Sequence, residues 1–267
     1  MLPGVYQSFM KNGTVYYRAS VTYRGKHISL GSFESEENAN SAYLLAGIVL
    51  SDSHGLKLEA YPKNCALTFH KWVVLINFRD NHIYFKNPIY IKKRYFLYYL
   101  DQITCLRFDA EDLFYYAHHK IMRRGGHLFV SDYGMQVNIL SRYGIKNHAV
   151  AGRDYCFANG DDCDYSYHNV LVINPYYGVS QVLNKSVPSY IAKIHINGDY
   201  LIGRYPSEVE AAIAYNKAVL LLKNKGLQKN YPQNYIEGLN EITYASVFQR
   251  LRISKKLIAY ADSIQTE

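Results

Sequence analysis

Polar and apolar side chains alternate along residues 17–23, which is the pattern of a β-strand with one buried and one exposed face. A turn at residues 24–26 and renewed alternation over 27–30 predict a hairpin, and residues 4–9 predict a strand before it. The apolar face of the central strand carries Tyr17, Ala19, Val21 and Tyr23, and its polar face carries Arg18, Ser20 and Thr22.

The period changes from strand to helix after Phe33. Ser35 stands where an N-cap belongs, and apolar residues then recur at helical spacing. Small alanines in this stripe allow a helix to lie close over a sheet. We therefore predict a module of three antiparallel strands with a helix over one face and the other face open. The stripe consists of Ala39, Ala42, Tyr43 and Ala46.

The same pattern occurs a second time in the chain. The offset is 174 residues between Gly4 and Gly178 and 172 residues between Tyr43 and Tyr215, so the order and spacing are kept. We interpret this as an internal repeat of a small module. In the second copy we expect Tyr190, Ala192, Ile194 and Ile196 to face the helix and Lys193, His195 and Asn197 to face outward. Ser207 and Glu210 form a capping-box pattern before the second helix.

Composition favours a polyanionic partner. The 267 residues carry a formal net charge of +8. They include 28 tyrosines, which suit binding surfaces, although we favour codon bias in an AT-rich genome as the reason for their number. The four cysteines form no Cys-x-x-Cys pair, so neither a zinc ribbon nor a disulfide framework is indicated. No apolar run approaches the ~18 residues of a membrane span, and no signal peptide is visible.

The repeat resembles the Apetala-two, or ethylene-response-factor, DNA-binding domain. The first copy carries the resemblance at Gly4-Val5, Tyr17-Arg18-Ala19, Val21, Leu30-Gly31-Ser32-Phe33, Glu36-Glu37 and Ala42-Tyr43. The second copy carries it at Gly178-Val179, Tyr190, Ala192, Ile194, Gly203, Glu208 and Ala214-Tyr215. In that family the sheet enters the major groove and outward side chains touch DNA. The alternative is an ordinary solvated sheet face.

The resemblance implies a set of DNA-binding residues in each copy. In the first copy they are Tyr6, Ser8, Arg18, Ser20, Thr22, His27 and Ser29, to which we add Arg24 and Lys26 of the turn. In the second copy they are Ser180, Lys193 and His195, to which we add Lys185 and Asn197. Plant members of the family hold Arg and Trp at many of these places. This chain has fewer Arg and no Trp there, so the recognised sequence does not carry over.

Residues 61–124 are aromatic and basic, with alternating pieces at 82–86 and 89–96. The segment 108–113 matches the spacing around Phe33, which suggests strands followed by a capped helix. One interpretation is an eroded third copy. Helix-capping chemistry alone would give the same appearance.

Residues 125–175 resemble an HNH homing-endonuclease module, with Asn159-Gly160-Asp161 as its turn. The family places an Asp-His pair before this turn, where His is the general base and Asp binds the metal. Cys156 and Phe157 occupy those places here, so the base is missing. Asn169 matches the central Asn, which has a scaffold role, and Asn174 is the nearest candidate for the last ligand. A rearranged metal site would draw on His148, Asp154, Asp161, Asp164 and His168. We favour a simple turn whose acids are solvated caps.

The sequence thus predicts an α+β protein of several modules. They are residues 1–60 and 176–232 as Apetala-two-like modules, 61–124 as an aromatic and basic linker domain, 125–175 as a degenerate HNH-like module, and 233–267 as a basic helical segment. The expected function is sequence-preferring binding of double-stranded DNA, as a transcriptional regulator derived from a homing endonuclease, without catalytic residues, metal or cofactor. The alternatives are an active metal-dependent HNH nuclease and a structural or RNA-binding protein. The expected location is the cytoplasm, at the nucleoid, in a bacterium or phage, and the nucleus in a eukaryote.

Overall fold

The computed structural model describes residues 1–51, 55–147, 149–184 and 187–264. It is a mixed α+β fold built from several small sheets, most of them antiparallel. The chain divides into two compact units. Unit 1 comprises Met1–Ile139 and Asp161–Asn169, and unit 2 comprises Leu140–Gly160 and Val170–Glu267.

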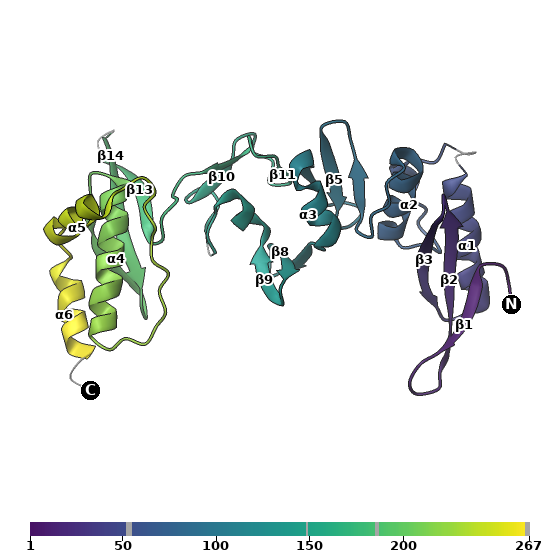
Figure 1. The fold of residues 1–267 in the computed structure, drawn as a ribbon, viewed down its shortest axis with the longest axis horizontal. Coiled ribbons are helices and arrows are strands. Elements are labelled where there is room, and N and C mark those ends of the chain that lie inside the picture. The colour runs from purple at the N-terminus through teal and green to yellow at the C-terminus, as the bar shows by residue number, and fades with distance from the viewer. Residues whose placement is uncertain (52–54, 148, 185–186, 265–267) are drawn as a thin grey trace. The chain divides into compact units, whose positions relative to one another are not determined.

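The first repeat forms a three-stranded antiparallel sheet and a helix, as predicted (Figure 1). Its elements are β1 Val5–Phe9, β2 Val15–Tyr23, β3 Lys26–Phe33 and α1 Glu36–Leu50. Ser35 is the N-cap of α1, and its hydroxyl accepts a hydrogen bond from Asn38 N at 3.1 Å. Ala39, Ala42 and Ala46 are fully buried, so the helix lies directly on one face of the sheet. Among the described residues of unit 1, no helix covers the opposite face.

The second repeat forms the same arrangement in unit 2 (Figure 1). Its elements are β13 Val179–Asn184, β14 Val187–His195, β15 Asp199–Tyr205 and α4 Glu208–Asn224. Ser207 caps α4 by accepting from Glu210 N. The prediction that Tyr190, Ala192 and Ile194 face the helix is confirmed, because all three belong to the core packed against α4.

The C-terminal segment is helical, but it is two helices rather than one. They are α5 Glu241–Arg250 and α6 Lys255–Ile264, and Leu251, Leu257 and Ala261 are buried in the core of the second repeat. The linker between the helices is held to the sheet, since Ser254 N donates to Ile202 O at 2.8 Å. The segment therefore closes the second module.

Both repeats contain the same irregularity in the third strand. The register shifts between Ala19 and Ser20 in the first sheet and between Ala192 and Lys193 in the second. In each case one residue of the third strand, Leu30 or Ile202, has no partner on the central strand, which is a β-bulge. A one-residue bulge exchanges the two faces of the strand beyond it.

The rest of unit 1 surrounds a second helix and a second sheet. The elements are α2 Phe69–Asn81, β4 Ile89–Ile91, β5 Tyr95–Tyr99, β6 Cys105–Asp109, β11 Asp164–Tyr165, α3 Leu113–His118, β7 Met122–Arg124, β8 His127–Asp132 and β9 Met135–Asn138. Arg79 of α2 is buried and donates to Val49 O and Leu56 O, which fixes the end of α1. Residues 83–86 form no strand, contrary to the alternation there, and 89–96 contain a turn between β4 and β5.

The segment predicted as an HNH-like module is divided between the two units. In unit 2, β10 Tyr155–Phe157 pairs antiparallel with β12 Val170–Val172. The chain then runs through turns directly into β13, so no helix follows this hairpin. The acidic turn and β11 belong to unit 1.

Candidate nucleic-acid interface

The register of the first sheet places most of the predicted residues on its open face. Tyr6, Arg18 and Ser32 are directly opposite one another across the three strands. Since residues two apart share a face, further pairs lie on the same side. They are Ser8 with Tyr16, Ser20 with Ser29, and Thr22 with His27.

Exposure separates this set into accessible and inaccessible members. Tyr6 is 55% exposed, and Arg18, Thr22, His27 and Ser29 are also exposed. Ser20 is only 9% exposed, so its hydroxyl offers little contact to a ligand. Ser8 is half-buried.

The two cations of the first hairpin turn do not belong to the open face. Lys26 is opposite Tyr23, on the helix side, and its ammonium lies 5.3 Å from the ring centre of Tyr84. Arg24 has a positive φ of 47° in the turn, and its guanidinium lies over the Tyr23 ring. The structure therefore does not bring Arg24 and Lys26 together with Arg18.

The second sheet presents an open face of different chemistry. Ser180, Ile191 and Arg204 form the row that corresponds to Tyr6, Arg18 and Ser32. The next rows are Lys193 with Leu201 and His195 with Asp199. Lys193 and His195 are exposed as predicted, and Asn197 is exposed in the turn beyond them. The predicted residue Lys185 lies outside the described residues.

Arg204 is a cation of the open face that sequence reasoning missed. Strict alternation from Tyr200 through Ile202 assigns Arg204 to the helix side. The bulge at Ile202 reverses the alternation, so Arg204 faces outward. The apolar pattern alone carries no signal for this, because Ile202 is buried either way. The equivalent residue of the first sheet is Ser32, so the repeat gives no signal for an arginine at this place either.

A carboxylate lowers the positive charge at one end of the second face. His195 Nδ1 is 2.9 Å from Asp199 Oδ1, and both side chains are exposed. The hydrogen bond from His195 holds the pKa of Asp199 below its usual value, with Lys193 and Arg153 adding to the effect. The carboxylate thus stays ionised at neutral pH and partly offsets Lys193.

Most residues considered for a rearranged nuclease site have structural partners. Asp154 accepts from Val150 N and from the Arg153 guanidinium. Burial raises its pKa, but these bonds outweigh burial and leave the pKa below the usual value. Asn174 is buried, donates to Arg153 O and accepts from Gln181 N. Asp164 is buried and accepts from Ser166.

The other residues considered for a nuclease site are the two histidines and the two residues that replace the Asp-His pair. His168 is exposed at the surface of unit 1, and His148 lies outside the described residues. Cys156 and Phe157 are half-buried in β10 of unit 2. Phe157, which stands at the place of the HNH histidine, cannot act as a general base.

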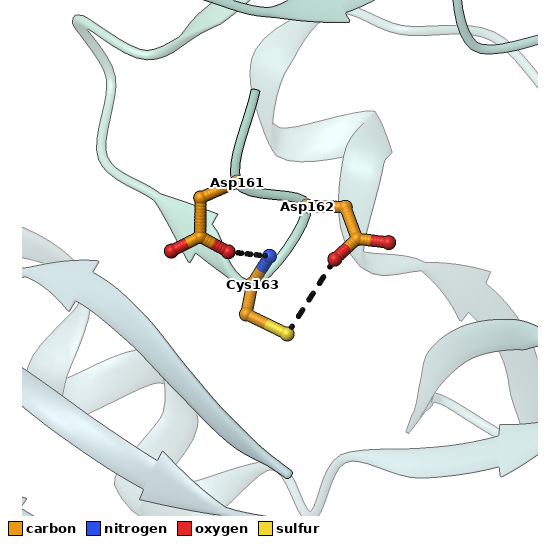
Figure 2. A group of neighbouring side chains, drawn as sticks. All are labelled: Asp161, Asp162 and Cys163. Atoms are coloured by element: carbon orange, nitrogen blue, oxygen red, sulfur yellow. Dashed lines mark hydrogen bonds between the residues drawn. The ribbon is translucent and has the colours of Figure 1, made fainter. Parts of the chain in front are cut away.

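Three neighbouring side chains in the acidic turn of unit 1 are close enough together to be considered as ligands of one metal ion. Asp161, Asp162 and Cys163 present ligand atoms within 4.8 Å of one another (Figure 2). Asp161 is already engaged by Cys163 N at 2.9 Å, and both aspartates are exposed. Burial, together with the two aspartates, raises the pKa of the Cys163 thiol, which disfavours the thiolate that binds metals. The arrangement is that of a solvated turn.

No family model, curated protein or solved structure matches this chain. Among the described residues, no helix has both the length and the apolar character that crossing a membrane requires.

Proposed function

We propose that this protein binds double-stranded DNA through the open faces of its two repeated sheets, with some sequence preference. The observation that carries the proposal is the shared cross-strand row. Each sheet, with the same bulge, exposes one arginine in this row: Arg18 on the central strand of the first and Arg204 on the third strand of the second.

The shape and charge of these faces support contact with the major groove. That groove admits β-ribbons as well as helices, and arginine pairs with guanine edges or with phosphates. Tyr6, Thr22 and His27 add exposed donors and acceptors beside Arg18.

We propose a regulatory rather than a cleaving role. The HNH-like segment has Phe157 in place of the histidine directly before its turn, and Asp154, Asp164 and Asn174 are held by hydrogen bonds within their own units. A protein that occupies a DNA site without cutting it serves to control transcription or to mark the site.

Selection of bound duplexes from a random pool, followed by fluorescence anisotropy with the full chain, tests this function. We expect Arg18→Ala and Arg204→Ala each to weaken binding to the selected duplex about tenfold, as loss of a specific arginine contact does. Lys223→Ala is the matched control, because Lys223 is an exposed cation on α4, which covers the opposite face of the second sheet.

Three results would count against the proposal. The first is a pool without enrichment. The second is equal weakening by Lys223→Ala, which would reduce the effect to net charge. The third is better competition by A-form RNA than by duplex DNA, since the deep, narrow RNA groove does not admit a sheet.

A further inference from the structure

Unit 2 contains a pocket of about 810 Å³, which is within the ~300–1,000 Å³ range of small-molecule sites. It is lined by residues 145–147, 149, 153 and 154 on one side and by the start of β13, the end of β14 and the segment 229–232 on the others. Ser180, Lys193 and His195 of the open face line it too. The repeat alone does not account for the pocket, because Lys146, Arg153 and Asp154 lie outside both copies.

The walls of the pocket are fixed by hydrogen bonds. Asn174 bonds both to Arg153 O and to Gln181 N, so it ties the 145–154 segment to β13. On the opposite side, Lys229 Nζ and Tyr231 OH donate to His195 O at 3.1 and 3.0 Å. The cavity is therefore built into the unit, and both sides are anchored to the same sheet.

The charge of the pocket is unbalanced. Its lining includes four cationic side chains and two carboxylates. Asp154 is paired with Arg153 at 2.6 Å, and Asp199 is paired with His195 at 2.9 Å. The cations are Lys146, Arg153, Lys193 and Lys229. Four cations against two carboxylates leave a net positive charge for an anionic ligand.

Lys146 is the most unusual of these cations. Its ammonium lies 4.8 Å from the ring centre of Tyr177, and among the described residues no carboxylate comes within ion-pair distance of it. Burial lowers its pKa to about 8, against the opposing effect of Asp154. Keeping a half-desolvated amine without a close carboxylate is costly, and such residues are typical of binding and catalytic sites.

Aromatic rings line the same cavity. Three half-buried tyrosines contribute to it, and a planar ring can stack on such side chains. They are Tyr176, Tyr177 and Tyr231, whereas Tyr215 of the lining is only 5% exposed. Cations for a phosphate and rings for a base are the two groups that a nucleotide requires.

We propose that this pocket binds a nucleoside phosphate, with Lys146 and Lys193 facing the phosphate and the tyrosines facing the base. The ligand has two possible sources, a free nucleotide or a nucleotide of a DNA strand. The proposal does not depend on duplex binding by the open faces, because a free nucleotide is sufficient to occupy the pocket.

Isothermal titration of the full chain with ATP, dAMP, adenosine and inorganic phosphate tests the free ligand, and titration with a single-stranded 12-mer tests the strand. We expect at least one nucleotide probe or the 12-mer to bind at micromolar concentration. Adenosine and inorganic phosphate should each bind at least about tenfold more weakly, since each supplies only one of the two groups. Lys146→Ala should weaken the binding about tenfold, as loss of a charge-assisted contact does.

Lys223→Ala, which removes an exposed lysine of the same unit, is the control and should change nothing. Binding of ATP or dAMP alone identifies a free nucleotide, and binding of the 12-mer alone identifies a strand. The proposal is overturned if all probes fail to bind at millimolar concentration. It is also overturned if inorganic phosphate binds as tightly as the nucleotides, or if Lys146→Ala and Lys223→Ala have equal effects while Lys146→Ala retains its native circular dichroism.

Discussion

Gly178 lies directly against the aromatic ring of Tyr215. A Cβ atom on Gly178 would overlap this ring and the carbonyl oxygen of Lys193. Gly178 O accepts a hydrogen bond from Lys193 N at 2.8 Å, next to the bulge of the second sheet. Gly4 has the same relationship to Tyr43 in the first sheet, and Gly4 O accepts from Ser20 N. In both copies the entry to the sheet depends on a residue without a side chain.

We expect Gly178→Ala to destabilise the second module. Gly178 has a φ of +69°, which costs an alanine ~1–2 kcal/mol, and the overlap with Tyr215 adds ~1–3 kcal/mol. Hydrogen exchange of the amides in β13–β15 would measure the loss. Gly198→Ala is the control, because an added Cβ there meets no atom within 4 Å. Equal protection in the two variants would contradict the close approach.

Lys146→Met should make unit 2 more stable at pH 7, by about 1 kcal/mol, because it removes the cost of burying a charge. The folded pKa of Lys146, about 8, is below the unfolded value of 10.5, so folding releases a proton between these values. Stability of the native chain should therefore rise as pH increases from about 8 to 10.5.

The variant should lose this contribution to the pH dependence, which urea unfolding at several pH values measures. The other charged or titratable groups of the pocket are present in both proteins. Their contributions to the pH dependence of stability therefore cancel in the comparison. They are Arg153, Asp154, Tyr176, Tyr177, Lys193, His195, Asp199, Tyr215, Lys229 and Tyr231. Destabilisation of the variant at pH 7 would show that the Lys146 side chain is not desolvated.

Binding to duplex DNA should depend steeply on salt and should need both modules. Each phosphate contact contributes roughly −0.9 to the slope of log affinity against log salt concentration. Tethering raises the effective concentration of the second contact, so avidity can exceed the affinity of one module by about 10²–10⁴. Combining Arg18→Ala with Lys193→Ala should weaken binding more than either change alone, and anisotropy from 50 to 300 mM salt measures both effects. A flat salt response would falsify the nucleic-acid interpretation.

Asp199→Asn should tighten duplex binding by about two- to fivefold. The substitution removes a carboxylate from the open face and releases His195 and Lys193 from its field. A gain of this size corresponds to the ~0.4–1 kcal/mol of an exposed charge pair. Glu237→Gln makes the same change of charge in an exposed loop and should have less effect. If the two variants behave alike, only net charge matters.

We expect no cleavage of plasmid DNA with Mg²⁺ or Mn²⁺. Phe157 cannot accept a proton, and Cys156 does not offer the oxygen ligand that Mg²⁺ prefers. Metal-dependent nicking by the native chain that disappears in His168→Ala would assign it to the nuclease alternative. Weak nicking gained by Cys156→Asp with Phe157→His would show that only these side chains were lost.

Local signals explain which parts of the fold could be predicted from the sequence. Alternation over residues 17–23 and the capping residues Ser35 and Ser207 are short-range features, and the structure confirms all three. The bulges are different, because Leu30 and Ile202 continue the apolar pattern while reversing the faces beyond them. Because of that reversal, strict alternation assigns Arg204 to the wrong face of the sheet.

The pocket of unit 2 could not be predicted in this way. It joins Lys146, Lys193 and Lys229, which are far apart in the chain and belong to no common motif. Only tertiary contacts, such as those of Asn174 with Arg153 and Gln181, bring the segments together. The alternation over residues 83–86 wrongly predicted a strand, because no neighbouring strand supplies the hydrogen bonds that a sheet requires.

The arginine lies on the central strand in the first sheet and on the third strand in the second. This difference has a consequence for the kind of DNA target. Two identical modules could read two identical half-sites, and the complex could then be turned end for end. Here the same row reads Tyr-Arg-Ser in one sheet and Ser-Ile-Arg in the other. If both rows contact DNA, the two half-sites differ and the target has a polarity. The protein would then point in one direction along the duplex, and a neighbouring gene on one side would be distinguished from one on the other.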